Sequence, residues 1–339
     1  MGEEFIMNRR TLLAGTAFAA LAPIISVADT QLSPAAAQTL PKQKPTVLIT
    51  GTSSGIGKAA AIAFAKAGWF TLATMRDVSG RNLGTALELT EIAKAEALAL
   101  RVIEIDVTNA ASVGAGVAEA ETLANGRFDL LVNNAGIYVP LPAELMTPEA
   151  LQISLDTNVL GYQRMARAIA PYMRARGDGL VLNISSGAGR VVFPLLGGYC
   201  ATKHAVEALS DSWRYELAPF GVDVCVLQPD DTRTQLFDNA RRYVQDMLAK
   251  LPAADERRRS DYQRHLSLLK TALEVEDDAA EPAVVAAAIL KLAQTPKGQR
   301  PARTRLGGQL PVAINDAVAQ AQQKILKNSP FADWMTVKL

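Results

Sequence analysis

Two residues of this chain, Tyr199 and Lys203, stand one helical turn apart, and Ser186 lies thirteen residues before the tyrosine. Residues four apart share a helix face, so the ammonium of Lys203 can lie beside the phenol of Tyr199. A free phenol titrates near pH ~10, and a neighbouring positive charge favours the phenolate and lowers its pKa. Such a pair could exchange a proton with a hydroxyl or carbonyl oxygen. Any helix can carry the pair by chance, so its meaning depends on the surrounding elements.

A glycine-rich turn, TGTSSGIG, occupies residues 50–57 between a short apolar run and an alanine-rich helical pattern. Glycines permit a tight turn and a close approach of the backbone to a pyrophosphate, and a helix N-terminus attracts negative charge. In this context the turn favours dinucleotide binding. The residues expected to contact the cofactor are Gly51, Ser53, Ser54, Gly55, Ile56 and Gly57. No Gly-Lys-Ser/Thr ending follows, which disfavours a P-loop nucleotidase.

Short apolar runs alternate with longer helical patterns from residue 46 onward. Strands are predicted at 46–50, 69–74, 101–105, 128–132, 180–184 and 222–227, and helices at 56–67, 85–98, 110–124, 151–176 and 199–218. Apolar strands without alternation, placed between helices, are typical of a parallel sheet that is covered on both faces. The sequence therefore predicts an α/β fold, a three-layer Rossmann-type doubly wound parallel sheet.

The pattern changes after residue 234. Residues 235–280 are polar and charged, with apolar residues at helical spacing. We interpret this segment as a C-terminal helical lid over a substrate pocket. Further helices are predicted at 281–293 and 312–327. Residues 41–339 are thus expected to form a single domain.

Composition excludes several classes of function. The chain has 339 residues, 49% of them apolar, and a formal net charge of +1, which suits one large domain or at most two. A near-neutral balance argues against nucleic acid or an anionic membrane surface as a partner. The two cysteines and two histidines form no cluster in the sequence, so no metal site is predicted.

The first forty residues resemble an export signal. Arg9 and Arg10 precede an uncharged stretch at 11–28, and small residues follow up to Ala37. A charged start, an apolar middle and a small-residue end predict a twin-arginine signal, cut after Ala37, and a periplasmic protein without a stable membrane span. The alternative is an uncleaved N-terminal membrane anchor, because eighteen residues could barely span a bilayer.

Four motifs occur in the order and spacing of the short-chain dehydrogenases/reductases. They are the turn at 50–57, the stretch Asn133-Asn134-Ala135-Gly136, Asn158, and Ser186 with Tyr199 and Lys203. The likeness is strong over about residues 46–234 and weaker to about 310. The stretch 199–205 particularly resembles the retinol-dehydrogenase and 17β-hydroxysteroid-dehydrogenase-like members.

This resemblance implies a role for each catalytic candidate. Tyr199 would be the general acid/base, and Lys203 would lower the tyrosine pKa and hold the nicotinamide ribose hydroxyls. Ser186 would donate a hydrogen bond to the substrate oxygen and stabilise the charge that develops there. Asn158 would hold a water molecule that links Lys203 to solvent for proton relay.

The resemblance also implies further cofactor contacts. They are Asp106 and Val107 beside the adenine, Asn133, Ala135 and Gly136 at the adenosine and ribose, and Pro229 and Thr234 at the nicotinamide. One position departs from the family pattern Pro-Gly-x-x-x-Thr, because Asp230 replaces the glycine. If that site requires positive φ, aspartate tolerates it less well than glycine.

The choice of cofactor depends on the end of the second strand. An acidic side chain there binds the free 2′-hydroxyl of NAD, whereas an arginine accommodates the 2′-phosphate of NADP. Arg76 occupies the deciding position, so NADP (NADPH) is favoured over NAD, although Asp77 directly after it weakens the inference.

These features together predict an NADP-dependent oxidoreductase that interconverts an alcohol and a carbonyl by hydride transfer. The family's pocket walls imply a mainly apolar substrate, with walls at Tyr138, Phe193, Leu195, Leu196, Leu236 and Phe237. A non-catalytic NADP-binding sensor or scaffold of the same fold is the alternative. Family habit implies a homodimer or homotetramer.

Overall fold

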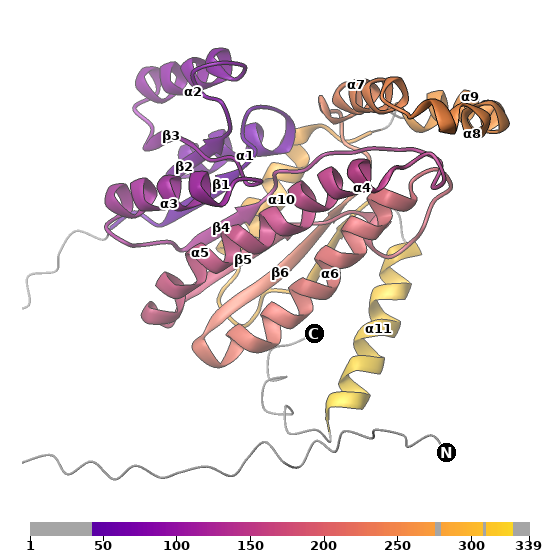
Figure 1. The fold of residues 1–339 in the computed structure, drawn as a ribbon. Coiled ribbons are helices and arrows are strands. Elements are labelled where there is room, and N and C mark those ends of the chain that lie inside the picture. The colour runs from indigo at the N-terminus through magenta and orange to yellow at the C-terminus, as the bar shows by residue number, and fades with distance from the viewer. Residues whose placement is uncertain (1–42, 275–278, 308–309, 328–339) are drawn as a thin grey trace, which may run out of the picture. The chain divides into compact units, whose positions relative to one another are not determined.

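A seven-stranded parallel sheet forms the centre of the computed structural model, which describes residues 43–274, 279–307 and 310–327 (Figure 1). The strands are β1 (Thr46–Thr50), β2 (Phe70–Met75), β3 (Leu100–Glu104), β4 (Leu130–Asn133), β5 (Gly179–Ile184), β6 (Val222–Pro229) and β7 (Arg303–Leu306). Their order is β3-β2-β1-β4-β5-β6-β7, and all neighbours pair in parallel. The order reverses between β1 and β4, which is where ligands bind in open α/β sheets.

Helices cover both faces of the sheet. One face packs against α1 (Gly55–Lys66), α2 (Leu83–Ala95) and α10 (Pro282–Gln294), and the other against α3 (Ala110–Ala124), α5 (Gly161–Arg176) and α6 (Gly197–Leu217). Val47 and Ile49 point into the first core, whereas Leu48 points into the second. Because β1 is buried on both sides, its sequence is a continuous apolar run. The predicted three-layer, doubly wound fold is confirmed.

The long helix predicted at 151–176 contains a π-helical turn. It begins as α4 (Pro148–Leu155), widens at Asp156–Leu160 and continues as α5. The hydroxyl of Thr147 caps its start by accepting a hydrogen bond from the Ala150 backbone N–H at 3.2 Å. Single π turns inside α-helices often lie at functional sites, and this one carries Asn158.

Strand β7 was not predicted. Its sequence, Arg-Thr-Arg-Leu, has no apolar run, although none of its residues is exposed. It pairs with β6 at the edge of the sheet, with Val226 opposite Arg303. Its arginines find acidic partners on other elements, since Arg303 Nε lies 2.8 Å from Glu207 Oε2. The last described helix, α11 (Leu310–Leu326), follows it.

Three helices occupy most of the segment interpreted as a lid: α7 (Leu236–Ala249), α8 (Glu256–Asp261) and α9 (Gln263–Ala272) (Figure 1). Two small apolar clusters join them to the loop that follows β4. In one, Val139 and Leu141 pack with Val244 and Leu269, and in the other Tyr138 packs with Phe237 and Leu273. Residues 275–278 of the segment lie outside the described residues. Movement of these helices as a lid, and the division into one domain at 41–339, stay predictions.

Candidate active site

A cavity of about 590 Å³ lies at the carboxyl ends of the strands. Most of the residues singled out from the sequence line it: Gly51, Ser53, Ser54, Gly55, Ile56, Arg76, Asp106, Val107, Ala135, Gly136, Ser186, Tyr199, Lys203, Pro229 and Thr234. Three others, Gly57, Asn133 and Asn158, do not reach its wall. The fold thus assembles residues from distant parts of the chain around one hollow.

The glycine-rich turn is shaped for close approach. Gly51 has φ +70°, and a Cβ there would lie 2.8 Å from the Cα of Ala135. Gly57 serves packing instead of the cavity, because a Cβ would lie 2.3 Å from the carbonyl oxygen of Gly51. Ser54 precedes α1 without a side-chain cap, so the first N–H groups of this helix remain available to an anion. These features fit the pyrophosphate of a dinucleotide.

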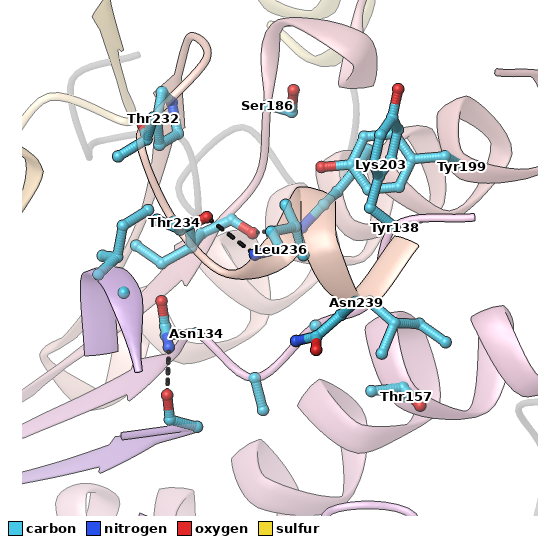
Figure 2. A pocket seen from close by; sticks show the side chains of 18 of the residues that line it. Asn134, Tyr138, Thr157, Ser186, Tyr199, Lys203, Thr232, Thr234, Leu236 and Asn239 are labelled. Atoms are coloured by element: carbon cyan, nitrogen blue, oxygen red, sulfur yellow. Dashed lines mark hydrogen bonds between the residues drawn. The ribbon is translucent and has the colours of Figure 1, made fainter. Parts of the chain in front are cut away.

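Asn134, which the sequence analysis did not select, ties this turn to the loop after β4 (Figure 2). Its Nδ2 donates to the carbonyl oxygens of Thr50 at 2.8 Å and Gly51 at 3.1 Å. In return, its backbone N–H donates to Thr50 Oγ1 at 2.9 Å. The signal was present, since Asn134 belongs to the Asn-Asn-Ala-Gly motif, but the motif does not say which asparagine points at the turn.

The other asparagine of the motif, Asn133, does not make the expected cofactor contact through its side chain. It is fully buried, and its Nδ2 donates to Asn183 Oδ1 at 2.9 Å. Asn183 in turn donates to Ser210 Oγ at 2.8 Å. Asn133 therefore links β4 to β5 and α6, because successive side chains of a strand point to opposite sides.

Tyr199 and Lys203 reach into the cavity from α6, and Ser186 faces them from the turn after β5 (Figure 2). The Lys203 Nζ lies 5.7 Å from the centroid of the Tyr199 ring and donates to the carbonyl oxygen of Ile184 at 2.9 Å. Ser186 Oγ accepts from the Ala188 backbone N–H at 3.2 Å, and a hydroxyl that accepts one bond can still donate another. Three of the four predicted catalytic side chains thus converge on the cavity.

The pKa of the Tyr199 phenol differs from the expectation that the neighbouring Lys203 charge lowers it. Burial raises the pKa of the Tyr199 phenol above its ordinary value, while a hydrogen bond with Ser186 lowers it in part. Burial also lowers the pKa of Lys203 from 10.5 to about 8, against the opposing effect of Glu207. Removal from water is therefore the largest cause of both shifts. The phenol stays protonated at neutral pH.

This shift in Lys203 predicts a pH-dependent stability. Between pH 8 and 10.5 the unfolded chain holds a proton on this amine that the folded chain has lost, so folding becomes more favourable as pH rises. Replacing Lys203 by Met removes the cost of the buried charge, which should raise the free energy of unfolding near pH 7 by up to ~3 kcal/mol. Urea unfolding of both proteins at several pH values should show this excess shrinking towards pH 10. A difference that is constant with pH would contradict the assignment.

Asn158 acts behind the cavity wall. Its Oδ1 accepts from the Ile137 backbone N–H at 2.8 Å, and its Nδ2 donates to the Ile137 carbonyl oxygen at 2.9 Å and to Thr202 Oγ1 at 3.1 Å. The side chain is fully buried, so its amide is occupied in joining the loop after β4 to α6. Asn158 is therefore a positioning residue here, and the proton relay implied by the resemblance stays a prediction.

The acidic neighbour of Arg76 points away from the cavity. Asp77 has φ 53°, and its Oδ2 accepts from the Arg81 backbone N–H at 2.9 Å. Arg76 lines the cavity, whereas Asp77 does not. No hydrogen bond or ion pair holds the Arg76 guanidinium within the part of the chain that the structure describes. Arg76 and Asp77 are adjacent in sequence, but only Arg76 lines the cavity.

The departure at Asp230 has a structural explanation. Among the described residues, positive φ outside glycine occurs at Asp77, Ala97, Asn125 and Leu195, so Asp230 does not need the left-handed conformation. Its backbone N–H donates to the Leu306 carbonyl oxygen at 2.9 Å, and its carboxylate bonds to the guanidinium of Arg305. Arg305, on β7, also lines the cavity. Sequence reasoning missed this arginine because β7 itself was not predicted.

Aromatic and aliphatic side chains form another part of the wall. Of the residues expected there, Tyr138, Phe193, Leu196, Leu236 and Phe237 line the cavity, while Leu195 packs in the cluster with Val139 instead. Tyr138 meets Tyr199 edge to face, with 4.9 Å between ring centroids. Val191 and Tyr243 also line the cavity, and neither was predicted from the sequence.

A family model described as short chain dehydrogenase matches residues 45–245, which contain the glycine-rich turn, Ser186, Tyr199 and Lys203. The chain belongs to this family. The short-chain dehydrogenase is therefore an NAD(P)-dependent oxidoreductase, as its relatives, which are named reductases and dehydrogenases, also indicate. The predicted family and enzyme class are confirmed.

Individual relatives are similar over most of this dehydrogenase. A protein of Bacteroides thetaiotaomicron named 3-ketodihydrosphingosine reductase is 33% identical over 265 residues, which are 78% of this chain and 88% of the relative. The 17-beta-hydroxysteroid dehydrogenase type 1 of Homo sapiens is 36% identical over 208 residues, 60% of this chain and 61% of the relative. A solved short-chain dehydrogenase from Sphingobium yanoikuyae in complex with NADPH has a TM-score of 0.64 and 26% identity, covering 84% of this chain and 96% of that chain.

The prediction of a periplasmic or membrane-anchored dehydrogenase is wrong. It rested on residues 1–40, which lie outside the described residues. The Bacteroides reductase, which matches over 88% of its length, supports assignment to the enzyme family and does not support export. Among the described helices, none is both long and apolar enough to cross a membrane. An arginine pair before an alanine-rich stretch is a feature of composition, which does not by itself specify export.

Proposed function

We propose that this dehydrogenase uses NADP to interconvert an alcohol and a ketone or aldehyde on a mainly apolar substrate, with Tyr199 as the acid/base. The observation that carries the proposal is the convergence of Tyr199, Lys203 and Ser186 on a cavity that also holds the glycine-rich turn and Arg76. NADPH, when bound, supplies the hydride. The protein supplies the proton, the orientation and the electrostatic environment.

Each side chain has a separate task in the proposed reaction. The Tyr199 phenol gives its proton to the carbonyl oxygen, and Ser186 donates a hydrogen bond to the same oxygen as negative charge develops. Lys203 would hold the ribose hydroxyls with its ammonium. Because burial raises the pKa of Tyr199, its phenol is protonated and can donate a proton when a carbonyl is reduced.

The preference for NADP rests on the contrast between Arg76 and Asp77. Arg76 lines the cavity directly after the end of β2, where the 2′-position of the adenosine ribose is expected. The Asp77 carboxylate is held 2.9 Å from the Arg81 backbone N–H, within its own turn. A planar guanidinium can bind a phosphate with two hydrogen bonds, so the accessible side chain is the one that suits NADP.

The apolar wall supports a substrate with an extended apolar body. Tyr138, Leu196 and Phe237 belong to one apolar cluster beside Tyr199, so a carbonyl near the phenol would place the rest of the substrate against them. The names of two relatives include a 3-keto compound and a hydroxysteroid, which agree with a secondary alcohol or ketone. We assign α7, α8 and α9 as the cover of this pocket within a single domain, and a homodimer or homotetramer as the assembly.

Oxidation of NADPH with a panel of carbonyl compounds tests the proposed function. The panel contains steroids, retinoids, aliphatic aldehydes, cyclic ketones and long-chain 3-ketones, each followed by the loss of NADPH absorbance. Turnover of ketones with large apolar bodies is the expected result. Tight NADPH binding without turnover of any compound would favour the non-catalytic sensor or scaffold instead.

A further inference from the structure

Four polar side chains from four separate elements close a ring of contacts behind the cavity. Glu207 Oε1 accepts from Gln228 Nε2 at 2.8 Å, and Gln228 Oε1 accepts from Asn315 Nδ2 at 2.7 Å. Asn315 Oδ1 accepts from Arg190 Nε at 2.9 Å, and Arg190 Nη2 lies 3.3 Å from Glu207 Oε2. We name these four residues the Glu207 ring. None of them lines the cavity itself.

Three of the four members of the ring stand next to a residue of the proposed site. Arg190 directly follows the short turn Gly187–Gly189, which begins after Ser186. Glu207 lies one helical turn after Lys203 on α6, and Gln228 directly precedes Pro229 on β6. The ring therefore joins the three elements that carry the serine, the lysine and the proline.

The turn after Ser186 also packs directly on the ring. A Cβ at Gly189 would lie 2.9 Å from the Cγ of Glu207, so only a glycine lets the turn approach this closely. The turn is held by its own backbone bonds, from the N–H of Gly189 to Ser186 O at 3.0 Å and from that of Arg190 to Gly187 O at 3.0 Å. Any shift of Glu207 would thus be transmitted to the backbone that carries the Ser186 hydroxyl.

Burial makes the ring sensitive to the loss of any member. Glu207 is 1% exposed and Gln228 is fully buried. Arg303 of β7 adds a second cation, with its Nε 2.8 Å from Glu207 Oε2. A buried carboxylate is tolerated when its hydrogen bonds are complete, and removing one partner leaves an unsatisfied group. The three hydrogen bonds and the ion pair of the ring restrict the movement of its members.

Asn315 brings α11 into the network. The side chains of α11 that the structure describes are exposed or half-buried, so this helix contributes little apolar packing. Its described polar side chains that contact other elements include Asn315 in the ring and Gln322. The Gln322 Nε2 donates to Oδ2 of Asp211 on α6 at 2.9 Å. One amide therefore connects a peripheral helix to the support of the catalytic turn.

The geometry points to Asn315 as a positioning residue that orients the Ser186 hydroxyl by closing the Glu207 ring from α11. This inference rests on the proposed function, in which Ser186 donates a hydrogen bond to the reacting oxygen. An open ring leaves Arg190 and Gln228 without their bridging amide, and the turn that carries Ser186 gains freedom. Misplacing a catalytic group by about 1 Å can cost up to 10²-fold in rate.

The test compares Asn315→Ala with Gln320→Ala, an exposed residue on the same helix. Asn315→Ala is expected to lower kcat by roughly tenfold or more while the Kd for NADPH stays unchanged, because the ring does not touch the cofactor region around Arg76. Gln320→Ala should match the wild type in both quantities. Asn315→Asp should also lower kcat, since its carboxylate still accepts from Arg190 Nε but cannot donate to Gln228 Oε1, which accepts from Asn315 Nδ2 at 2.7 Å.

Hydrogen exchange separates this inference from the proposed function. In Asn315→Ala, the amides of residues 187–191 should exchange faster, while those of β2 should keep the wild-type rate. This readout needs no substrate, so it remains decisive even if the wild type reduces no compound of the panel. Unchanged exchange at 187–191, or equal acceleration in β2, would overturn the positioning role.

Discussion

Replacing Tyr199 by Phe should lower kcat about 10²–10⁴-fold, which is the contribution expected of a positioned general acid. The substitution removes the phenol oxygen and keeps the ring, so the edge-to-face contact with Tyr138 at 4.9 Å is preserved. The Lys203 ammonium keeps its bond to the Ile184 carbonyl oxygen. NADPH binding, followed by the fluorescence of the reduced nicotinamide, is therefore expected to stay close to that of the wild type.

A matched control for this experiment is Tyr172→Phe. Tyr172, on α5, donates to Glu121 Oε2 at 2.7 Å and does not line the cavity. Loss of its hydroxyl should leave kcat unchanged. If Tyr199→Phe retained wild-type turnover, another group would have to deliver the proton, and the proposed role of Tyr199 would be rejected.

Replacing Arg76 by Ala should raise the KM for NADPH roughly 10–150-fold, the range that follows from losing charged hydrogen bonds worth ~1.5–3 kcal/mol. The KM for NADH should change little, because NADH carries no 2′-phosphate for this guanidinium to bind. Initial rates with both cofactors, at one fixed substrate concentration, give the two values. The ratio of the two effects is the informative quantity.

An arginine outside the cavity controls for a general loss of positive charge. Arg101 on β3 is exposed and does not line the cavity, so Arg101→Ala should leave both KM values as they are. Equal increases for NADPH and NADH in Arg76→Ala would refute the preference for NADP. Such a result would indicate that the guanidinium binds a part common to both cofactors.

Local patterns in the sequence were sufficient for the order and type of most elements. The strand predicted at 46–50 and the helix predicted at 110–124 agree with β1 and α3 at both ends. A parallel strand that is buried on both faces must be apolar throughout, and a helix against a sheet must repeat its apolar residues every three to four positions. Both requirements are visible in a short window of residues.

A strand without an apolar run could not be predicted from the sequence. Strand β7 contains Arg303 and Arg305, which would be read as solvent-exposed, yet both side chains are less than a tenth exposed. They can be buried because Glu207 and Asp230 supply the opposite charge. Glu207 stands 96 residues from Arg303, and Asp230 stands 75 residues from Arg305. No local window of the sequence contains both members of either pair.

The family resemblance in motif order and spacing predicted Ser186, Tyr199 and Lys203 as partners, and all three line one cavity. The tertiary structure decided how they behave: burial, and not the lysine charge, dominates the pKa of the phenol, and Asn133 and Asn158 serve the interior instead of the cavity wall. Residue type and spacing specify which groups can meet on a helix or at a strand end. Solvent exclusion and long-range partners depend on how the elements pack, and these determine the charge state and direction of each side chain.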